Sequence, residues 1–169
     1  MKIISVIGIT LSGKTTTIEN IIKELRKRKY TVGSVKEIHF ESFTMEIEGS
    51  NTDRHSKAGA ELVTARGMHE TDILFPEKLN INKILGFYSQ DFVILEGVSD
   101  TIAPKIIAAH DIEGIEDRLD DSVFAISGKI SIELSEYKGL PVINAMTSIE
   151  QLVDLIEEKA IEYSHGDEI

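Results

Sequence analysis

Short apolar runs alternate along the chain with segments whose apolar residues recur at helical spacing. Residues 3–7 are almost wholly apolar and mostly β-branched, which is typical of a strand buried on both faces in a parallel sheet. A helix is predicted from Thr15 onward, because aliphatic residues follow at helical spacing, and it ends in the basic run 26–29, which suits the negative end of a helix dipole. With a second strand predicted over 31–36, this part of the chain forms a strand–helix–strand unit.

The rest of the chain continues this alternation. Residues 37–52 are polar without sustained periodicity and predict a long excursion, and a helix is expected over 53–66. Ser148 with Gln151 forms a capping-box signature ahead of an amphipathic final helix. Strands are expected around 71–75, 92–95, 106–109, 123–126 and 142–143, and a helical segment near 81–88. The sequence therefore predicts one domain over 1–163, with the excursion at 37–52 and a frayed tail at 164–169.

Charge and the absence of cysteine exclude several classes of function. The 169 residues include 18 Lys plus Arg against 29 Asp plus Glu, a formal net charge of −11, which argues against a general nucleic-acid binder. Without cysteine there is no disulfide, Cys-ligated zinc, iron–sulfur cluster or thiol nucleophile, which fits a cytoplasmic location. The apolar runs are much shorter than the ~20 residues that span a bilayer, so no membrane partner is expected.

The strongest chemical signal lies in residues 8–15. The run Gly8-Ile9-Thr10-Leu11-Ser12-Gly13-Lys14-Thr15 fits G-x-x-x-x-G-K-[ST] between an apolar strand and an amphipathic helix, the context that this phosphate-binding loop requires. Glycines let the loop wrap closely, its N–H groups face the phosphates, Lys14 adds a positive charge, and the Thr15 hydroxyl is a ligand for Mg²⁺. The motif predicts nucleotide binding and an α/β fold of the P-loop NTPase type, a mostly parallel sheet flanked by helices on both faces.

Glu96 is the predicted second ligand of Mg²⁺. It follows the apolar run 92–95, where a buried strand emerges at the carboxyl edge of the sheet, and Gly97 allows close approach. The alternative is an ordinary solvated carboxylate at a strand end. His39 and His55 are candidates for phosphate contact or acid–base work, although a single histidine more often makes an ordinary hydrogen bond. The histidine spacing does not support a zinc site.

Several motifs together resemble the MobB family, the molybdopterin-guanine dinucleotide biosynthesis protein B family. Beyond the phosphate-binding loop, the resemblance rests on a Lys-x-x-His pattern after the second strand, an Ala-Gly-Ala helix, and later Glu-Gly and Pro-Lys-Ile motifs. In this sequence these motifs and their surroundings are residues 28–33, Val35-Lys36, His39, 53–60, 93–97 and Pro104-Lys105-Ile106. The order and spacing fit over nearly the whole chain.

The resemblance implies a Mg²⁺-dependent GTP-binding accessory protein with weak GTPase activity that acts as a homodimer. Its partner would be the nucleotidyltransferase MobA, which attaches GMP to molybdopterin to make the guanine dinucleotide form of the molybdenum cofactor. The residues assigned to the metal are Thr15 and Glu96, and no catalytic residue is assigned. Those assigned to the nucleotide are Gly8, Thr10, Leu11, Ser12, Gly13, Lys14, Thr15, Thr16, Lys36 and His39. The excursion at 37–52 would lie near the site or the dimer interface.

Some family positions differ in this chain. Of the common Lys-His-x-His-His pattern only Lys36 and His39 remain, Asn51-Thr52 replaces an Asp-Ser pair, and Val98-Ser99 replaces an aromatic residue and a lysine. The family often has Asp where Gly128 stands, and no Asn-Lys-x-Asp guanine-reading motif occurs. The sequence therefore does not decide between GTP and ATP. It also does not say whether the cofactor carries molybdenum or tungsten. The alternatives are a P-loop small-molecule or nucleoside kinase and a diverged nucleotide-gated adaptor.

Overall fold

A computed structural model describes residues 1–99, 101–164, 166 and 169. It divides into two compact units, a sheet unit formed by Met1–Glu37 and Gly86–Ile169, and an inserted unit formed by Ile38–Leu85. The inserted unit begins where the sequence predicts an excursion and continues well beyond residue 52. The single domain over 1–163 stays a prediction. Of the predicted tail, residues 165, 167 and 168 lie outside the described residues.

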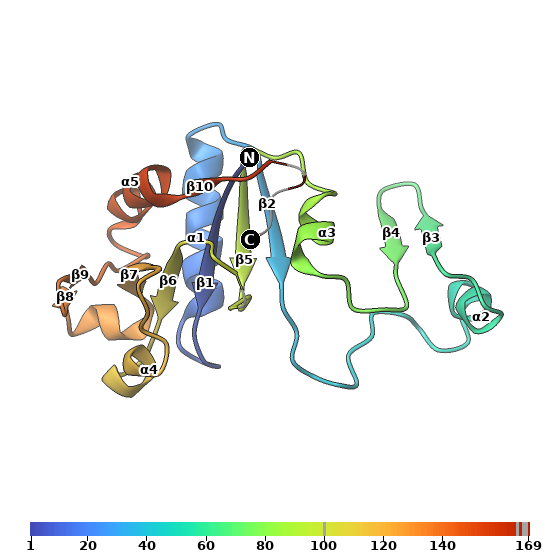
Figure 1. Cartoon of the computed structure of the whole chain (residues 1–169), viewed down its shortest axis with the longest axis horizontal. Helices are drawn as coiled ribbons and strands as arrows, with labels where there is room; N and C mark the ends of the chain where they lie inside the picture. The colour runs from blue at the N-terminus through green and yellow to red at the C-terminus, as the bar shows by residue number, and fades with distance from the viewer. Residues whose placement is uncertain (100, 165, 167–168) are drawn as a thin grey trace. The chain divides into compact units, whose positions relative to one another are not determined.

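The sheet unit is built on parallel strands in the order β2-β5-β1-β6-β7 (Figure 1). Their bounds are β1 Lys2–Ile7, β2 Val32–Lys36, β5 Phe92–Glu96, β6 Lys105–Ala108 and β7 Val123–Ser127. A short strand, β10 (Ile161–Glu162), pairs antiparallel with β1. The mostly parallel sheet confirms the predicted fold class, and its order places β1 between β5 and β6. Chain connections diverge to either side of β1, so the end of β1 is a topological switch point, where such sheets bind ligands.

Helices cover both faces of this sheet. On one face, α1 (Lys14–Lys27) and α5 (Ile149–Lys159) pack on alternate residues of the central strands, among them Ile4, Ile94 and Ile106, which are fully buried. On the other face, α4 (Ile112–Glu116) and the 3₁₀ helix η1 (Lys129–Ile132) join a second cluster with residues of β1, β6 and β7. A hairpin of β8 (Glu136–Tyr137) and β9 (Leu140–Pro141) follows η1. The two faces of the sheet thus line two separate cores.

Two local predictions in the sheet unit are wrong. Ser148 is the residue before α5, but its side chain makes no capping hydrogen bond. The turn is held instead by Asn144, whose side-chain Oδ1 accepts from the N–H groups of Met146 and Thr147. At 142–143 no strand forms, because Val142 makes only an isolated parallel bridge to Ile126. Within the described part of the chain, no helix is long and apolar enough to cross a membrane.

The inserted unit contains two short helices and one hairpin. Its elements are α2 (Asn51–Lys57), the antiparallel pair β3 (Val63–Arg66) and β4 (Thr71–Leu74), and α3 (Ile81–Leu85). The predicted helix over 53–66 is therefore wrong in its second half. The helix ends because Gly59 takes a left-handed conformation with φ of 103°, and the β-branched Val63 and Thr64 then begin a strand.

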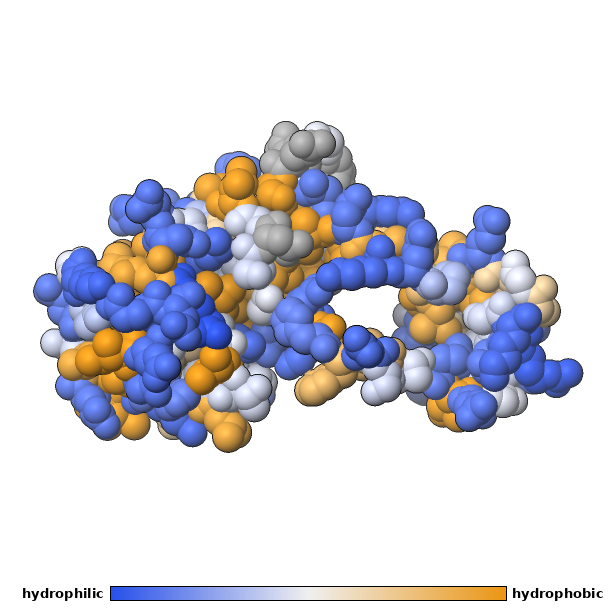
Figure 2. All heavy atoms as spheres, turned by 60° about the horizontal axis from the view of Figure 1, so that its bottom comes forward, coloured by the Kyte–Doolittle hydropathy of each residue, from blue (hydrophilic) through white to orange (hydrophobic). Residues whose placement is uncertain are grey.

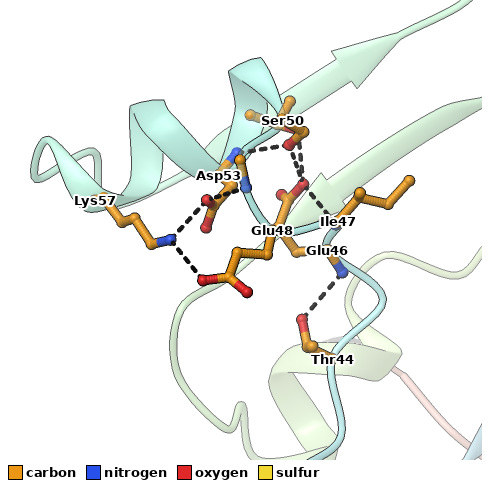
Figure 3. A network of polar contacts seen from close by, with 9 residues as sticks. Thr44, Glu46, Ile47, Glu48, Ser50, Asp53 and Lys57 are labelled. Atoms are coloured by element: carbon orange, nitrogen blue, oxygen red, sulfur yellow. Dashed lines mark hydrogen bonds and ion pairs between the residues drawn. The ribbon is translucent and has the colours of Figure 1, made fainter.

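A polar network holds the chain before α2 (Figure 3). One oxygen of Glu46, Oε1, accepts hydrogen bonds from the Ser50 hydroxyl at 2.7 Å and the Thr52 hydroxyl at 2.8 Å. Ser50 in turn caps the helix by accepting from the N–H of Asp53, and Lys57 pairs with Asp53 at 2.8 Å. The hydrogen bonds from the two hydroxyls hold the pKa of Glu46 below its ordinary value. Side-chain hydrogen bonds thus fix a segment that has little apolar packing.

Candidate nucleotide-binding site

The loop after β1 is shaped by three residues with positive φ, namely Gly8 at 153°, Leu11 at 65° and Gly13 at 94°. At Gly8 an added Cβ would lie 2.2 Å from the carbonyl oxygen of Ala108 at the end of β6, so only glycine fits without moving that backbone. Gly13 is the residue that starts α1. The sequence motif thus folds as a tight loop that turns from a buried strand directly into a helix.

The loop rests against the backbone that follows β7. The N–H of Lys129 donates to the carbonyl of Ser12 at 3.0 Å, and a Cβ added to Gly128 would lie 2.4 Å from that same carbonyl oxygen. Gly128 also has a φ of 86°, which side chains rarely adopt. The aspartate that the family often has at this position is therefore incompatible with this packing. Its absence follows from the close approach of the two backbones.

The start of α1 leaves several N–H groups for a ligand. The first helical hydrogen bond runs from the N–H of Thr17 to the carbonyl of Gly13 at 2.9 Å. The N–H groups of the helical residues before Thr17 therefore have no acceptor within the helix. The loop side chains Thr10, Leu11 and Thr16 are exposed around them, whereas the Ser12 hydroxyl is buried and without a hydrogen-bond partner. Free N–H groups at a helix N-terminus, together with the dipole, favour an anion such as phosphate.

Lys14 lies folded back over the loop. Its ammonium donates to the carbonyl of Gly8 at 3.0 Å. Burial lowers the pKa of this ammonium, Glu96 opposes the effect, and the positive charges of Lys36 and Arg118 lower the pKa further. Lys36 thus contacts the Glu96 carboxylate, and the charges of Lys36, Arg118 and Glu96 all act on Lys14, a distribution that suits a multiply charged anion.

The two predicted metal ligands meet at the carboxyl edge of the sheet. Glu96 ends β5, and its Oε1 accepts a hydrogen bond from the Thr15 hydroxyl at 3.3 Å. The Lys36 ammonium, at the end of the neighbouring strand β2, contacts the same oxygen at 2.8 Å. One carboxylate and one hydroxyl fit Mg²⁺, because this ion usually takes few protein ligands and completes its shell with water and phosphate oxygens. Among the described residues no group of three or more His, Cys, Asp or Glu is arranged to hold a metal on its own.

Two of the predicted residues lie outside the sheet unit. His39 and His55 belong to the inserted unit, where both are exposed and His55 lies on α2. They are therefore not part of the cluster within the sheet unit. The nucleotide residues Gly8, Lys14, Thr15 and Lys36 do lie together in the sheet unit.

Sequence reasoning missed two groups on the β6 side of the loop. Arg118 follows α4, donates to the carbonyl of Gly114 at 3.2 Å, and is close enough to act on the charge of Lys14. His110 follows β6 and pairs with Asp111 at 2.9 Å, while Asp111 also caps α4 by accepting from the N–H of Gly114. No local motif marks these residues, and only the parallel pairing of β1 with β6 indicates their proximity.

Comparisons with known proteins point to one family. The model of the family "Molybdopterin guanine dinucleotide synthesis protein B" (MobB) matches residues 3–128. One relative, from Methanocaldococcus jannaschii, is named as a molybdopterin-guanine dinucleotide biosynthesis adapter protein. It is 34% identical over 128 residues, which is 72% of this chain but only 52% of the relative's length. A Bacillus subtilis protein of the same description is 26% identical over 147 residues, 85% of each chain.

A solved structure shares the fold. The crystal structure of Bacillus subtilis MobB superposes with a TM-score of 0.76 and 23% identity, covering 96% of this chain and 100% of the other. At this level of identity the likeness concerns the fold alone.

Proposed function

Because the chain belongs to the MobB family, we propose that it is an adapter protein of molybdopterin-guanine dinucleotide biosynthesis that binds GTP with Mg²⁺. The observation that carries the nucleotide part is the convergence of Lys14, Thr15 and Glu96 beside the free N–H groups of α1. The biosynthetic part is supported by the names of the curated relatives.

In this proposal each residue has a distinct task. The N–H groups from Gly13 to Thr16 donate to phosphate oxygens, and Lys14 leaves the Gly8 carbonyl to contact the β- and γ-phosphates. Thr15 and Glu96 would hold Mg²⁺ by their side-chain oxygens, and the ion would neutralise part of the phosphate charge. The buried backbone contacts of Gly8 and Gly128 keep the loop in the shape that these contacts need.

We expect slow hydrolysis at most. Fast GTPases orient the attacking water with a dedicated side chain and neutralise the developing charge with an arginine. In the sheet unit Arg118 is the arginine whose charge acts on Lys14, and its guanidinium is engaged with the Gly114 carbonyl. The nucleotide then serves chiefly to set the state in which the adapter meets its partners. We propose these to be a second copy of the chain and a MobA-like nucleotidyltransferase carrying molybdopterin.

The first test is calorimetric titration with GTP and with ATP, each with and without Mg²⁺. Binding of GTP that needs Mg²⁺ and exceeds binding of ATP supports the proposal. We expect Lys14→Met to abolish binding without unfolding, whereas the control Lys23→Met, an exposed lysine on the same helix, retains it. Equal or stronger binding of ATP contradicts the guanine assignment and favours a kinase or a diverged adaptor.

The second test concerns the partner. The purified protein is mixed with a molybdopterin nucleotidyltransferase in the presence of GTP, a non-hydrolysable analogue or no nucleotide. An adapter gated by binding forms the complex equally well with GTP and with the analogue. A factor that uses the energy of hydrolysis works with GTP only, and no association under any condition contradicts the adapter role.

A further inference from the structure

One carboxylate oxygen at the candidate site serves two donors. Glu96 Oε1 accepts from both the Lys36 ammonium and the Thr15 hydroxyl, at 2.8 and 3.3 Å. The Glu96 side chain is only 11% exposed. A carboxylate removed from water in this way is costly unless a cation pairs with it, and Lys36 is the cation that does so.

Lys36 and Mg²⁺ would therefore compete for the same carboxylate. The oxygen that contacts Lys36 is the one that also contacts Thr15, the second residue assigned to the metal. A divalent ion placed there would face an ammonium at contact distance, with Lys14 also nearby. Because like charges at such a distance repel strongly, the ammonium and the ion exclude each other.

The two lysines of the site differ in how firmly they are held. Lys14 is partly buried and bonded to the Gly8 carbonyl, which belongs to the loop itself. The Lys36 side chain is 56% exposed, and its ammonium stands at the end of a long flexible aliphatic chain. The ammonium can therefore leave Glu96 without disturbing the core. A polyphosphate arriving beside it would offer a new anionic partner within reach of the same stem.

We propose that Lys36 is a placeholder cation, which neutralises Glu96 in the nucleotide-free protein and moves to the terminal phosphate when Mg²⁺ and nucleotide bind together. The proposal rests on the proposed function, since it assigns Glu96 to the metal. It makes the free protein a poor binder of metal alone and links metal binding to the arrival of phosphate.

The test uses Lys36→Met, which keeps the length of the side chain and removes its charge. Two titrations are made on the nucleotide-free protein, one with Mn²⁺ followed by electron paramagnetic resonance and one with inorganic tripolyphosphate followed by calorimetry. We expect Mn²⁺ to bind on the order of tenfold more tightly to the variant, and tripolyphosphate with Mg²⁺ to bind several-fold more weakly. The control Lys23→Met leaves both affinities unchanged.

Opposite changes in the two affinities are the signature of a placeholder. A lysine that only supports the local fold would weaken both on removal, and that result overturns the proposal, as does unchanged Mn²⁺ binding. If Lys36→Met fails to fold, the test uses Lys36→Arg instead, which keeps the positive charge. It is expected to exclude Mn²⁺ as the native protein does, and tight Mn²⁺ binding by this variant equally overturns the proposal. Neither titration contains GTP, so a failure of guanine binding or of partner binding is recognised separately.

Discussion

The sheet unit and the inserted unit are held together in different ways. In the sheet unit, β5 is buried along its whole length, and the strands and helices of the unit form two apolar cores. Among the described residues of the inserted unit, the buried hydrophobic side chains are Val63 and Leu85. Its large exposed hydrophobic residues are Phe40, Phe43, Met45, Ile47, Leu62, Met68 and Ile73. Figure 2 shows hydrophobic atoms in orange among the hydrophilic ones on the surface of the molecule.

This difference in packing suits two different tasks, binding of phosphate by the sheet unit and contact with other chains by the inserted unit. A phosphate-binding loop needs backbone groups fixed to within a fraction of an ångström, and the packed edge of β1, β6 and β7 supplies that rigidity. A segment with a small core and many exposed apolar side chains is instead typical of a surface that is completed by another chain. The inserted unit is accordingly the part that we expect to meet the proposed partners.

The largest expected effect comes from the core of the sheet unit. Ile94, on β5, is fully buried in the core that β5 shares with α1 and α5, so Ile94→Ala should lower the free energy of unfolding by about 2–5 kcal/mol through lost burial and a cavity. Ile73→Ala in the inserted unit, where the side chain is 53% exposed, should change it by ~0.5 kcal/mol or less. Denaturant unfolding measures both, and equal losses would erase the contrast between the units.

A second prediction isolates the close approach of the loop to Gly128. Gly128→Ala and Gly139→Ala both place a side chain at positive φ, but only at Gly128 would the new Cβ meet backbone atoms. We expect Gly139→Ala to cost about 1–2 kcal/mol from the strained φ alone, and Gly128→Ala a further ~1–3 kcal/mol from overlap with the carbonyl of Ser12. Thermal unfolding measures the cost, and calorimetry should show weaker nucleotide binding for Gly128→Ala only. A pair of identical costs would contradict the steric account.

A third prediction concerns the polar network of the inserted unit and its dependence on pH. Because hydrogen bonds lower the pKa of Glu46 in the folded state, its contribution is present above its unfolded pKa of about 4.5 and is lost as the pH falls through the lower folded value. Protection of the α2 amides against hydrogen exchange, corrected for intrinsic rates, should therefore decrease on acidification. Glu46→Gln should reduce it at neutral pH.

The matched control is Glu48→Gln, because Glu48 is 95% exposed and contacts Lys57 only at 4.0 Å. This variant should keep both the protection of α2 and its response to pH. If the two variants behave alike, the network around Ser50 and Thr52 does not hold the helix.

The smallest expected effect lies on the exposed apolar surface. Met68 is 95% exposed, so Met68→Gln should leave the free energy of unfolding within about 0.5 kcal/mol of the native value. The same change should reduce self-association or complex formation if the surface is an interface, which sedimentation measures. A substantial loss of stability in the isolated protein would show that the side chain is covered.

The sequence predicted best those features that are determined locally. Apolar runs located β1, β5 and β7, and the loop motif located Gly8, Lys14 and Thr15, because a strand followed by this loop and a helix is one continuous segment. The sequence-based predictions were wrong where contacts with distant parts of the chain determine the local structure. The helix expected over 53–66 gave way to a hairpin strand, and Asn144 took over the turn that Ser148 was expected to cap. Arg118 has no motif at all and is found only through its place after α4.

The residues that flank the inserted unit are anchored on β5 and β2. The inserted unit begins after Glu37, and the N–H of Glu37 donates to the carbonyl of Glu96. Shortly after its end, Tyr88 packs on Gly33 and donates its hydroxyl to the carbonyl of Ser34 at 2.7 Å. An insertion with neighbouring ends behaves as a loop, and doubling the length of a flexible loop costs only ~0.6 kcal/mol. Evolution can therefore enlarge, shorten or replace this segment while the sheet stays the same. If the inserted unit is where the proposed partners bind, partner choice can change in this way without rebuilding the phosphate-binding loop.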